Sequence, residues 1–165
     1  MAYDVNIQRA ELQLLIDLQG GRALIEKWCG EGLPEFPQKP NTYTSKSGDQ
    51  LCWVAPERWL LRSSIDNEDR LLETTRPESA PLDISIVEVS DSYQFFRLTG
   101  PDAGEIVSIA CPLDHHTSVF PANGISYTSL FNIKGLLARI DDGFEIAVEA
   151  SFGDMIEDYL SRANA

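Results

Sequence analysis

The residue types most able to do chemistry gather in one short segment, CPLDHH at residues 111–116, which holds both histidines of the chain. A thiol, a carboxylate and an imidazole could bind a metal ion, or Cys111 could act as a nucleophile with a histidine as its base. However, zinc sites need four well-spaced ligands, and neighbours in sequence rarely have the geometry of a nucleophile and its base. We therefore favour a structural interpretation, in which a helix over residues 101–110 stops before Pro112 and a histidine meets the negative end of its dipole.

An aromatic hairpin is the second feature of interest. Trp53 and Trp59 each lie three residues from Pro56. The two indoles could belong to the core, form a platform on which a ligand stacks, or anchor another protein. Because aromatic side chains usually bury most of their area, we favour core or partial core.

Two short acidic stretches, residues 90–92 (SDS) and residues 141–142 (DD), could hold protons or cations. Each lies between predicted strands, where Asx and Ser turns are the ordinary explanation. The sequence contains no G-x-G-x-x-G, Walker A, H-E-x-x-H, G-x-S-x-G or EF-hand pattern. We predict no catalytic, cofactor-binding or metal-binding residue on this chain.

Composition limits the partners and the compartment. The net charge of −13 and the pI near 4.4 repel phosphate backbones and anionic lipids, so neither nucleic acid nor membrane is a predicted partner. Three cysteines without a C-x-x-C pair indicate a reducing cytosol. The N-terminus has no apolar signal region and no stretch is long enough to span a membrane, which predicts a cytoplasmic protein.

The elements that must position these residues follow a pattern that occurs twice. Residues 12–18 and residues 93–99 have the period of strands, each is followed by a glycine, Gly20 or Gly100, and a helix comes next. These strand-helix units superpose at an offset of 80 residues. They predict an internal duplication.

Hairpins repeat as well, at an offset of 85 residues. Residues 51–55 and 58–62 turn at Pro56-Glu57, and residues 136–141 and 144–149 turn at Asp142-Gly143, for which a type I′ turn is predicted. Each hairpin leads into a helix with a predicted N-cap, Asp66 in the first and Ser151 in the second.

Both halves thus have the order strand, helix, hairpin, helix, with further strands at residues 83–89 and 127–133. The predicted fold is α+β, built from duplicated split βαβ (ferredoxin-like) modules. We expect one domain over residues 1–165, made of two similar halves at about 10–90 and 91–165.

The segments WVAPERWLL at residues 53–61 and CPLD at residues 111–114 carry a resemblance to the gamma subunit of heterotetrameric sarcosine oxidase. Shorter matches run in family order over about residues 10–162, including PNT at 40–42, VSDS at 89–92, LTGP at 98–101 and FP at 120–121. The family pattern has an aliphatic residue at His115 and a proline at Thr117, which leaves His115 without a family role. The motif positions that could contact other subunits are Trp53, Pro56, Trp59, Cys111, Pro112, Asp114 and His116.

The resemblance implies a fold like the folate-binding domain of glycine-cleavage aminomethyltransferases. It also implies a non-catalytic structural subunit of a bacterial heterotetramer that demethylates sarcosine, or a related N-methyl amine, to glycine, with formaldehyde or 5,10-methylenetetrahydrofolate and hydrogen peroxide as further products. FAD, FMN, NAD and tetrahydrofolate would lie on the alpha and beta subunits and zinc on the delta subunit. The alternatives are a small independent folate-binding or aminomethyltransferase-like protein and, third, a metal or thiol enzyme built on Cys111.

Overall fold

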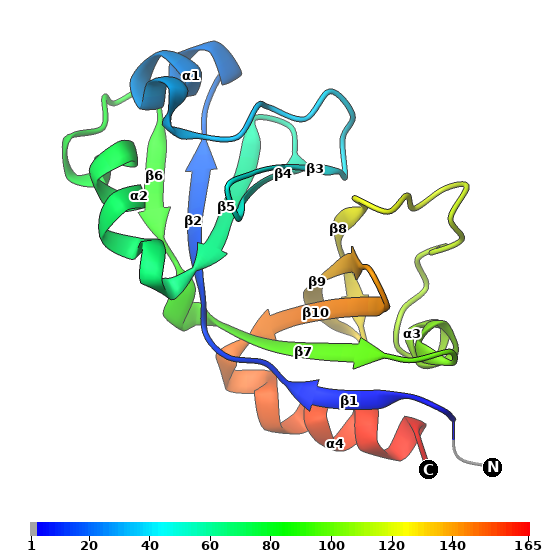
Figure 1. The fold of residues 1–165 in the computed structure, drawn as a ribbon. Helices are drawn as coiled ribbons and strands as arrows, with labels where there is room; N and C mark the ends of the chain where they lie inside the picture. The colour runs from blue at the N-terminus through cyan, green and yellow to red at the C-terminus, as the bar shows by residue number, and fades with distance from the viewer. Residues whose placement is uncertain (1–2) are drawn as a thin grey trace. The chain divides into compact units, whose positions relative to one another are not determined.

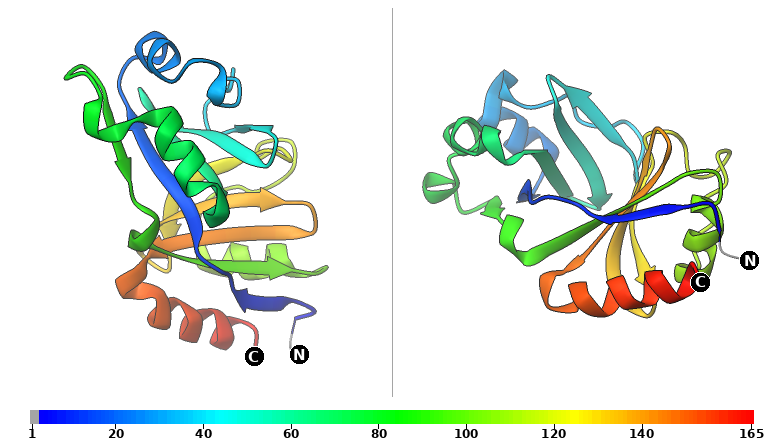
Figure 2. Two further views of the ribbon diagram at one scale, coloured as in Figure 1. Left: turned by 60° about the vertical axis from the view of Figure 1, so that its left-hand side comes forward. Right: turned by 60° about the horizontal axis from the view of Figure 1, so that its bottom comes forward.

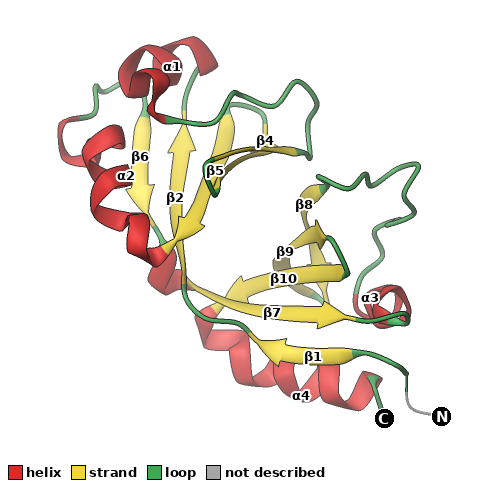
Figure 3. Ribbon diagram, in the orientation of Figure 1, coloured by secondary structure: helices red, strands yellow, loops and turns green. Residues whose placement is uncertain are grey.

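The computed structural model describes residues 3–165, which form two compact units (Figures 1 and 3). Unit 2 is Leu12–Ser90, and unit 1 joins Asp91–Ala165 with the N-terminal segment that ends at Glu11. Each unit has an antiparallel sheet and a hydrophobic core of its own. That the two units make a single domain stays a prediction.

Unit 2 is a split βαβ module with one added edge strand. Its sheet has the order β3-β4-β5-β2-β6. The elements are β2 (Gln13–Gln19), α1 (Arg22–Cys29), β3 (Tyr43–Lys46), β4 (Asp49–Ala55), β5 (Arg58–Ser64), α2 (Glu68–Thr75) and β6 (Ser85–Glu88). Without β3, this is the strand order of a ferredoxin-like module.

Unit 1 repeats the arrangement, but its outermost strand comes from the start of the chain. Its sheet has the order β1-β7-β10-β9-β8. The elements are β1 (Asn6–Arg9), β7 (Tyr93–Thr99), α3 (Ala103–Ala110), β8 (Ile125–Leu130), β9 (Ile133–Ile140), β10 (Gly143–Glu149) and α4 (Gly153–Ala163). The predicted halves missed β1, which pairs with β7 as β6 pairs with β2.

The strand registers confirm the duplication. Gln19 pairs with Arg58 where β2 meets β5, and Thr99 pairs with Gly143 where β7 meets β10. Gln19 and Thr99 are 80 positions apart, and Arg58 and Gly143 are 85 positions apart, which are the two offsets that the sequence predicts. The two units therefore share their central strand pairing residue by residue.

Glycine is required at the same place in both units. Gly20 has φ +131° and Gly100 has φ +117°, values that side chains rarely adopt. A Cβ atom on Gly20 would lie 3.0 Å from the carbonyl oxygen of Asp83, and one on Gly100 would lie 2.7 Å from that of Asp4. In each unit the carbonyl belongs to the residue two positions before the outermost strand, so the close approach is duplicated too.

Each core lies between the helices and one face of the sheet of its own unit. Figure 2 shows the helices and sheets from two further sides. In unit 2 the alternating residues Leu14, Ile16 and Leu18 of β2 pack with Ile25 of α1 and Leu71 of α2. The alternation follows from the pleat, which sends successive side chains to opposite faces. The α+β class with helices on one side of each sheet is confirmed.

One predicted turn differs in the structure. The β9–β10 turn is Asp141–Asp142, and neither residue has a positive φ, so the type I′ prediction there is wrong. Gly143 lies in β10, where a Cβ atom would come within 2.0 Å of the carbonyl oxygen of Leu98. Close packing therefore selects this glycine. In unit 1 the turn with two positive φ angles is Phe131–Asn132, between β8 and β9, and in unit 2 it is Ser47–Gly48, between β3 and β4.

The predicted helix N-caps are also wrong. The 3-10 turn Ile65–Asn67 leads into α2, and the 3-10 turn Ala150–Phe152 leads into α4. Asp66 donates its backbone N–H to the Ser64 side chain, and neither α-helix has a side-chain N-cap. A tight turn thus replaces the capping side chain between strand and helix.

Candidate functional site

The buried thiol of Cys111 starts the loop that follows α3. Cys111 is extended, as a residue before proline prefers, and the helix ends at Ala110. Its Sγ lies 3.3 Å from Oγ1 of Thr128 and accepts the N–H of Leu113 at 3.3 Å. With 5% of its surface exposed, the thiol anchors the loop and faces away from solvent.

Asp114 and His116 lie in an exposed turn of the same loop. Oδ1 of Asp114 accepts the backbone N–H of His116 at 2.9 Å. Nδ1 of His116 lies 2.7 Å from Oγ of Ser118 and accepts its backbone N–H at 3.3 Å. Both side chains are therefore engaged in turn hydrogen bonds, and they do not converge with the Cys111 thiol.

His115 lies at the opposite end of α3 from the one that the sequence suggested. Its ring meets the Phe144 ring edge-on at 5.2 Å between centroids, and a Cβ atom on Gly104 would lie 3.2 Å from its Nε2. Gly104 is in the first turn of α3, so the predicted contact with the helix C-terminus is wrong. The loop therefore runs back along the helix, and His115 packs against Gly104 and Phe144.

Arg139 of β9 holds this loop in place. Its guanidinium donates to the carbonyl oxygens of His115 and Phe120, the latter at 3.1 Å, and lies 4.7 Å over the Phe144 ring. The sequence analysis did not single out Arg139, although a cation directly after the apolar run Leu136–Ala138 is a detectable signal.

An open hollow of about 500 Å³ lies beside the loop in unit 1. Its walls include Asp114, His115, His116, Arg139 and Phe144. The polar groups here are turned toward the protein's own backbone. Over residues 3–165, no three His, Cys, Asp or Glu side chains gather closely enough to hold a metal ion.

The aromatic hairpin has the predicted core role. Trp59 is 4% exposed and meets Phe36 edge-on at 5.2 Å, while Trp53 is half-buried and donates Nε1–H to the carbonyl oxygen of Ala55 at 3.0 Å. Pro56 is exposed in the turn, where Glu57 has a positive φ. Unit 2 thus places Trp53, Pro56 and Trp59 on one hairpin, and unit 1 places the 111–116 segment on its loop.

The acidic stretches also serve turns. The hydroxyl of buried Ser90 accepts the N–H of Leu15 at 2.9 Å, and the N–H of Ser90 binds the Glu88 carboxylate at 2.7 Å. The carbonyl oxygen of Asp142 accepts the N–H of Gly100 at 3.1 Å. Both stretches therefore lie in turns, but their hydrogen bonds to Leu15 and Gly100 reach other segments of the chain and are not Asx or Ser turns.

Cys29, at the end of α1, is a second buried thiol, and its environment differs from that of Cys111. Burial away from water raises its pKa to about 11, and the nearby Arg76 charge opposes this only in part. Cys29, Cys52 and Cys111 are all free and buried. At neutral pH the Cys29 thiol is protonated and therefore a poor nucleophile.

Comparison with known proteins decides the family. The family model described as "sarcosine oxidase, gamma subunit family" matches residues 33–165. The chain belongs to this family. The sarcosine oxidase subunit gamma of Corynebacterium sp. (strain P-1) is 28% identical over 136 residues, which cover 81% of this chain and only 64% of that relative.

Two solved structures share the fold of this gamma subunit family member. A chain of the heterotetrameric sarcosine oxidase from Corynebacterium sp. U-96, in complex with pyrrole 2-carboxylate, has a TM-score of 0.81 at 23% identity, covering 98% of this chain and 86% of that one. The glycine cleavage system aminomethyltransferase T from Bartonella henselae has a TM-score of 0.67 at 16% identity, covering 96% of this chain and 46% of that one. At these identities the likeness establishes the fold alone, and it confirms the predicted likeness of fold to aminomethyltransferases.

A search of the helices in residues 3–165 found none that is both long and apolar enough to cross a membrane.

Proposed function

We propose that this chain is a non-catalytic structural subunit of a heterotetrameric sarcosine oxidase, with alpha, beta and delta subunits as its cytoplasmic partners. The observation that carries the proposal is the family match over residues 33–165. In this assignment the complex oxidatively demethylates sarcosine or a related N-methyl amine to glycine. Formaldehyde or 5,10-methylenetetrahydrofolate and hydrogen peroxide are the other products.

The geometry of the reactive side chains supports a structural role. The Cys111 thiol, the Asp114 carboxylate and the His116 imidazole each bond to the loop or to a neighbouring strand. A nucleophile and its base must lie within hydrogen-bond reach of each other, and these groups do not. As the family resemblance implies, we propose that FAD, FMN, NAD and tetrahydrofolate lie on the alpha and beta subunits and zinc on the delta subunit.

Assembly in the native host tests the proposal. A tagged full-length chain is co-expressed with the host's sarcosine oxidase subunits and purified through the tag. We expect three further polypeptides and a flavin absorbance spectrum in the eluate. A tagged chain that elutes alone, with no flavin, would contradict the proposal.

A titration of the isolated chain with tetrahydrofolate separates this proposal from the independent folate-binding alternative. That alternative has the fold likeness to aminomethyltransferase T in its favour. However, this chain spans only 46% of that enzyme, so we expect no heat of binding. Saturable binding by the chain alone would favour the alternative.

A further inference from the structure

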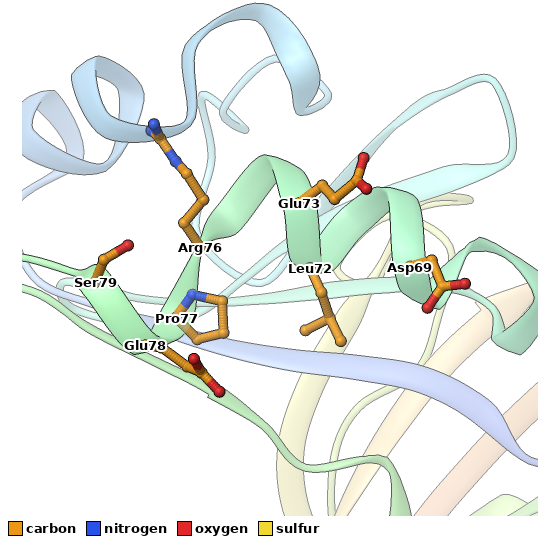
Figure 4. A pocket seen from close by; sticks show the side chains of 7 residues that line it. All are labelled: Asp69, Leu72, Glu73, Arg76, Pro77, Glu78 and Ser79. Atoms are coloured by element: carbon orange, nitrogen blue, oxygen red, sulfur yellow. The ribbon is translucent and has the colours of Figure 1, made fainter.

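A second hollow of about 500 Å³ lies in unit 2, beside α2 and the 3-10 turn Pro77–Ser79 (Figure 4). Its lining includes Asp69, Leu72, Glu73, Arg76, Pro77 and Glu78. In Figure 4 the side chains of Asp69, Leu72 and Glu78 project to one side of the helix, while Arg76 extends to the opposite side. The hollow therefore presents carboxylates next to apolar surface.

The local cations do not neutralise these carboxylates. Arg70 donates two hydrogen bonds to the buried carboxylate of Asp49, at 2.8 and 2.9 Å. Arg76 lies 4.1 Å over the Trp28 ring and donates to the Trp28 carbonyl oxygen. Within residues 3–165, no side chain pairs with the carboxylates of Asp69 and Glu78.

The apolar part of the hollow indicates what kind of group would fit. Leu72 and Pro77 are half-buried and lie between the two carboxylates in Figure 4. Lysine and arginine carry an apolar stem and a cationic head, so the stem can lie on Leu72 and Pro77 while the head meets Asp69 and Glu78. Leu82, which follows the same turn, is fully exposed and adds apolar surface that a polypeptide can cover and a small cation cannot.

We propose that this hollow is the docking site for a lysine- or arginine-bearing segment of a neighbouring subunit. The inference rests on the proposed function, because it names the surface by which this subunit joins its complex. Charge complementarity is the main argument: two unpaired carboxylates and a net charge of −13 select a basic segment at this contact. The contact steers assembly and fixes its orientation.

Charge reversal in the co-expressed complex tests the site. The variant is Asp69→Lys with Glu78→Lys, and the measured quantity is flavin absorbance per mole of tagged full-length chain. We expect this ratio to fall at least about tenfold, because like charges then meet across the contact. Wild-type assembly should also weaken as ionic strength rises, since exposed charge pairs are screened.

Unit 1 supplies a control with the same kind of change, Glu105→Lys with Asp91→Lys. Glu105 lies in the first turn of α3 as Asp69 lies in that of α2, and Asp91 lies in a 3-10 turn as Glu78 does. This control makes the same change in net charge, and we expect it to retain flavin. Far-ultraviolet circular dichroism of each isolated variant tests whether it is folded. The neutral pair Asp69→Asn with Glu78→Gln provides a milder second test, with a smaller loss in the same direction.

The outcomes separate the two proposals. If the wild-type chain does not co-purify with flavin, the proposed function and the docking site both fail. If the wild-type chain assembles and the reversed variant retains as much flavin as the control, the docking site alone is wrong. A further outcome is that the isolated wild-type chain self-associates in a salt-sensitive way that the reversed variant loses. That result would show that the occupant is a second copy of this chain, and it would also overturn the proposal.

Discussion

The two units place an aromatic contact at the same point of the fold but build it from different residues. In unit 2 the Phe36 ring meets Trp59 at 5.2 Å and 77°, and in unit 1 the His115 ring meets Phe144 at 5.2 Å and 87°. Trp59 and Phe144 are equivalent at the offset of 85 residues. Phe36 is buried and His115 is half-exposed.

This comparison changes how the histidine is understood. In each unit, the loop position needs a flat ring that fills the space between the loop and the strand that carries Trp59 or Phe144. Either a phenyl or an imidazole ring satisfies this need. In both units an arginine also lies over one ring of the contact, Arg22 at 5.3 Å from Phe36 and Arg139 at 4.7 Å from Phe144. The chemistry that the 111–116 segment suggested is therefore secondary to its packing.

Removing the ring on the strand should have the largest effect. We expect Trp59→Ala and Phe144→Ala each to lower the free energy of unfolding of the full-length chain by about 3–5 kcal/mol, since each leaves a cavity in its core. Urea denaturation measures this. Trp53→Ala, at a half-buried indole, is the control and should cost less. Similar losses for all three variants would show that the ring contact is not special.

Adding a methyl group at the duplicated glycines should have the next largest effect. Gly20→Ala and Gly100→Ala combine a positive φ with a carbonyl contact, and we expect each to cost about 2 kcal/mol or more. Gly48→Ala is the control, because Gly48 has φ +88° but no atom within 4 Å of the added Cβ, so only about 1 kcal/mol is expected. Equal costs in thermal melts would mean that the close approach contributes nothing.

Exchanging the two loop rings sharpens the comparison directly. Phe36→His buries a polar ring and should destabilise unit 2 by about 1–3 kcal/mol. The site of His115 is half-exposed, so His115→Phe should change the free energy of unfolding by no more than about 0.5 kcal/mol. Both are measured by urea denaturation. A large loss in His115→Phe would show that the imidazole makes a polar contact that packing does not explain.

The smallest expected effect concerns thiol reactivity. With a pKa of about 11, Cys29 is about one part in a thousand thiolate at pH 8, against about a quarter for an ordinary exposed thiol. Mass spectrometry after iodoacetamide should find Cys29 unmodified in the folded chain and modified in urea. Because folding raises this pKa, the stabilising contribution is present below about pH 8.5 and is lost as pH rises toward 11. Rapid alkylation of the folded chain at pH 8 would contradict this.

The sequence predicted most of the regular elements because their signals are local. Period-2 alternation and the following glycines placed β2 and β7, and the duplication supported the hairpins. By contrast, β1 has only four residues and pairs with a strand about ninety positions away, so no local pattern reveals it. The turn Phe131–Asn132 was missed because a bulky aromatic residue rarely adopts a positive φ.

The candidate site was predictable in its residues but not in its geometry. The segment 111–116 was found from composition alone. The place of His115 depends on Gly104, Phe144 and Arg139, which come from three other elements, and only tertiary packing brings them together.

Sarcosine turnover by the purified chain is the most direct test of a subunit without catalysis of its own. Hydrogen peroxide formation is followed with sarcosine as substrate, first with this chain alone and then with the flavin-containing complex isolated through its tag. The account predicts peroxide from the complex and none from the chain alone. Sustained peroxide formation by the isolated chain would contradict it.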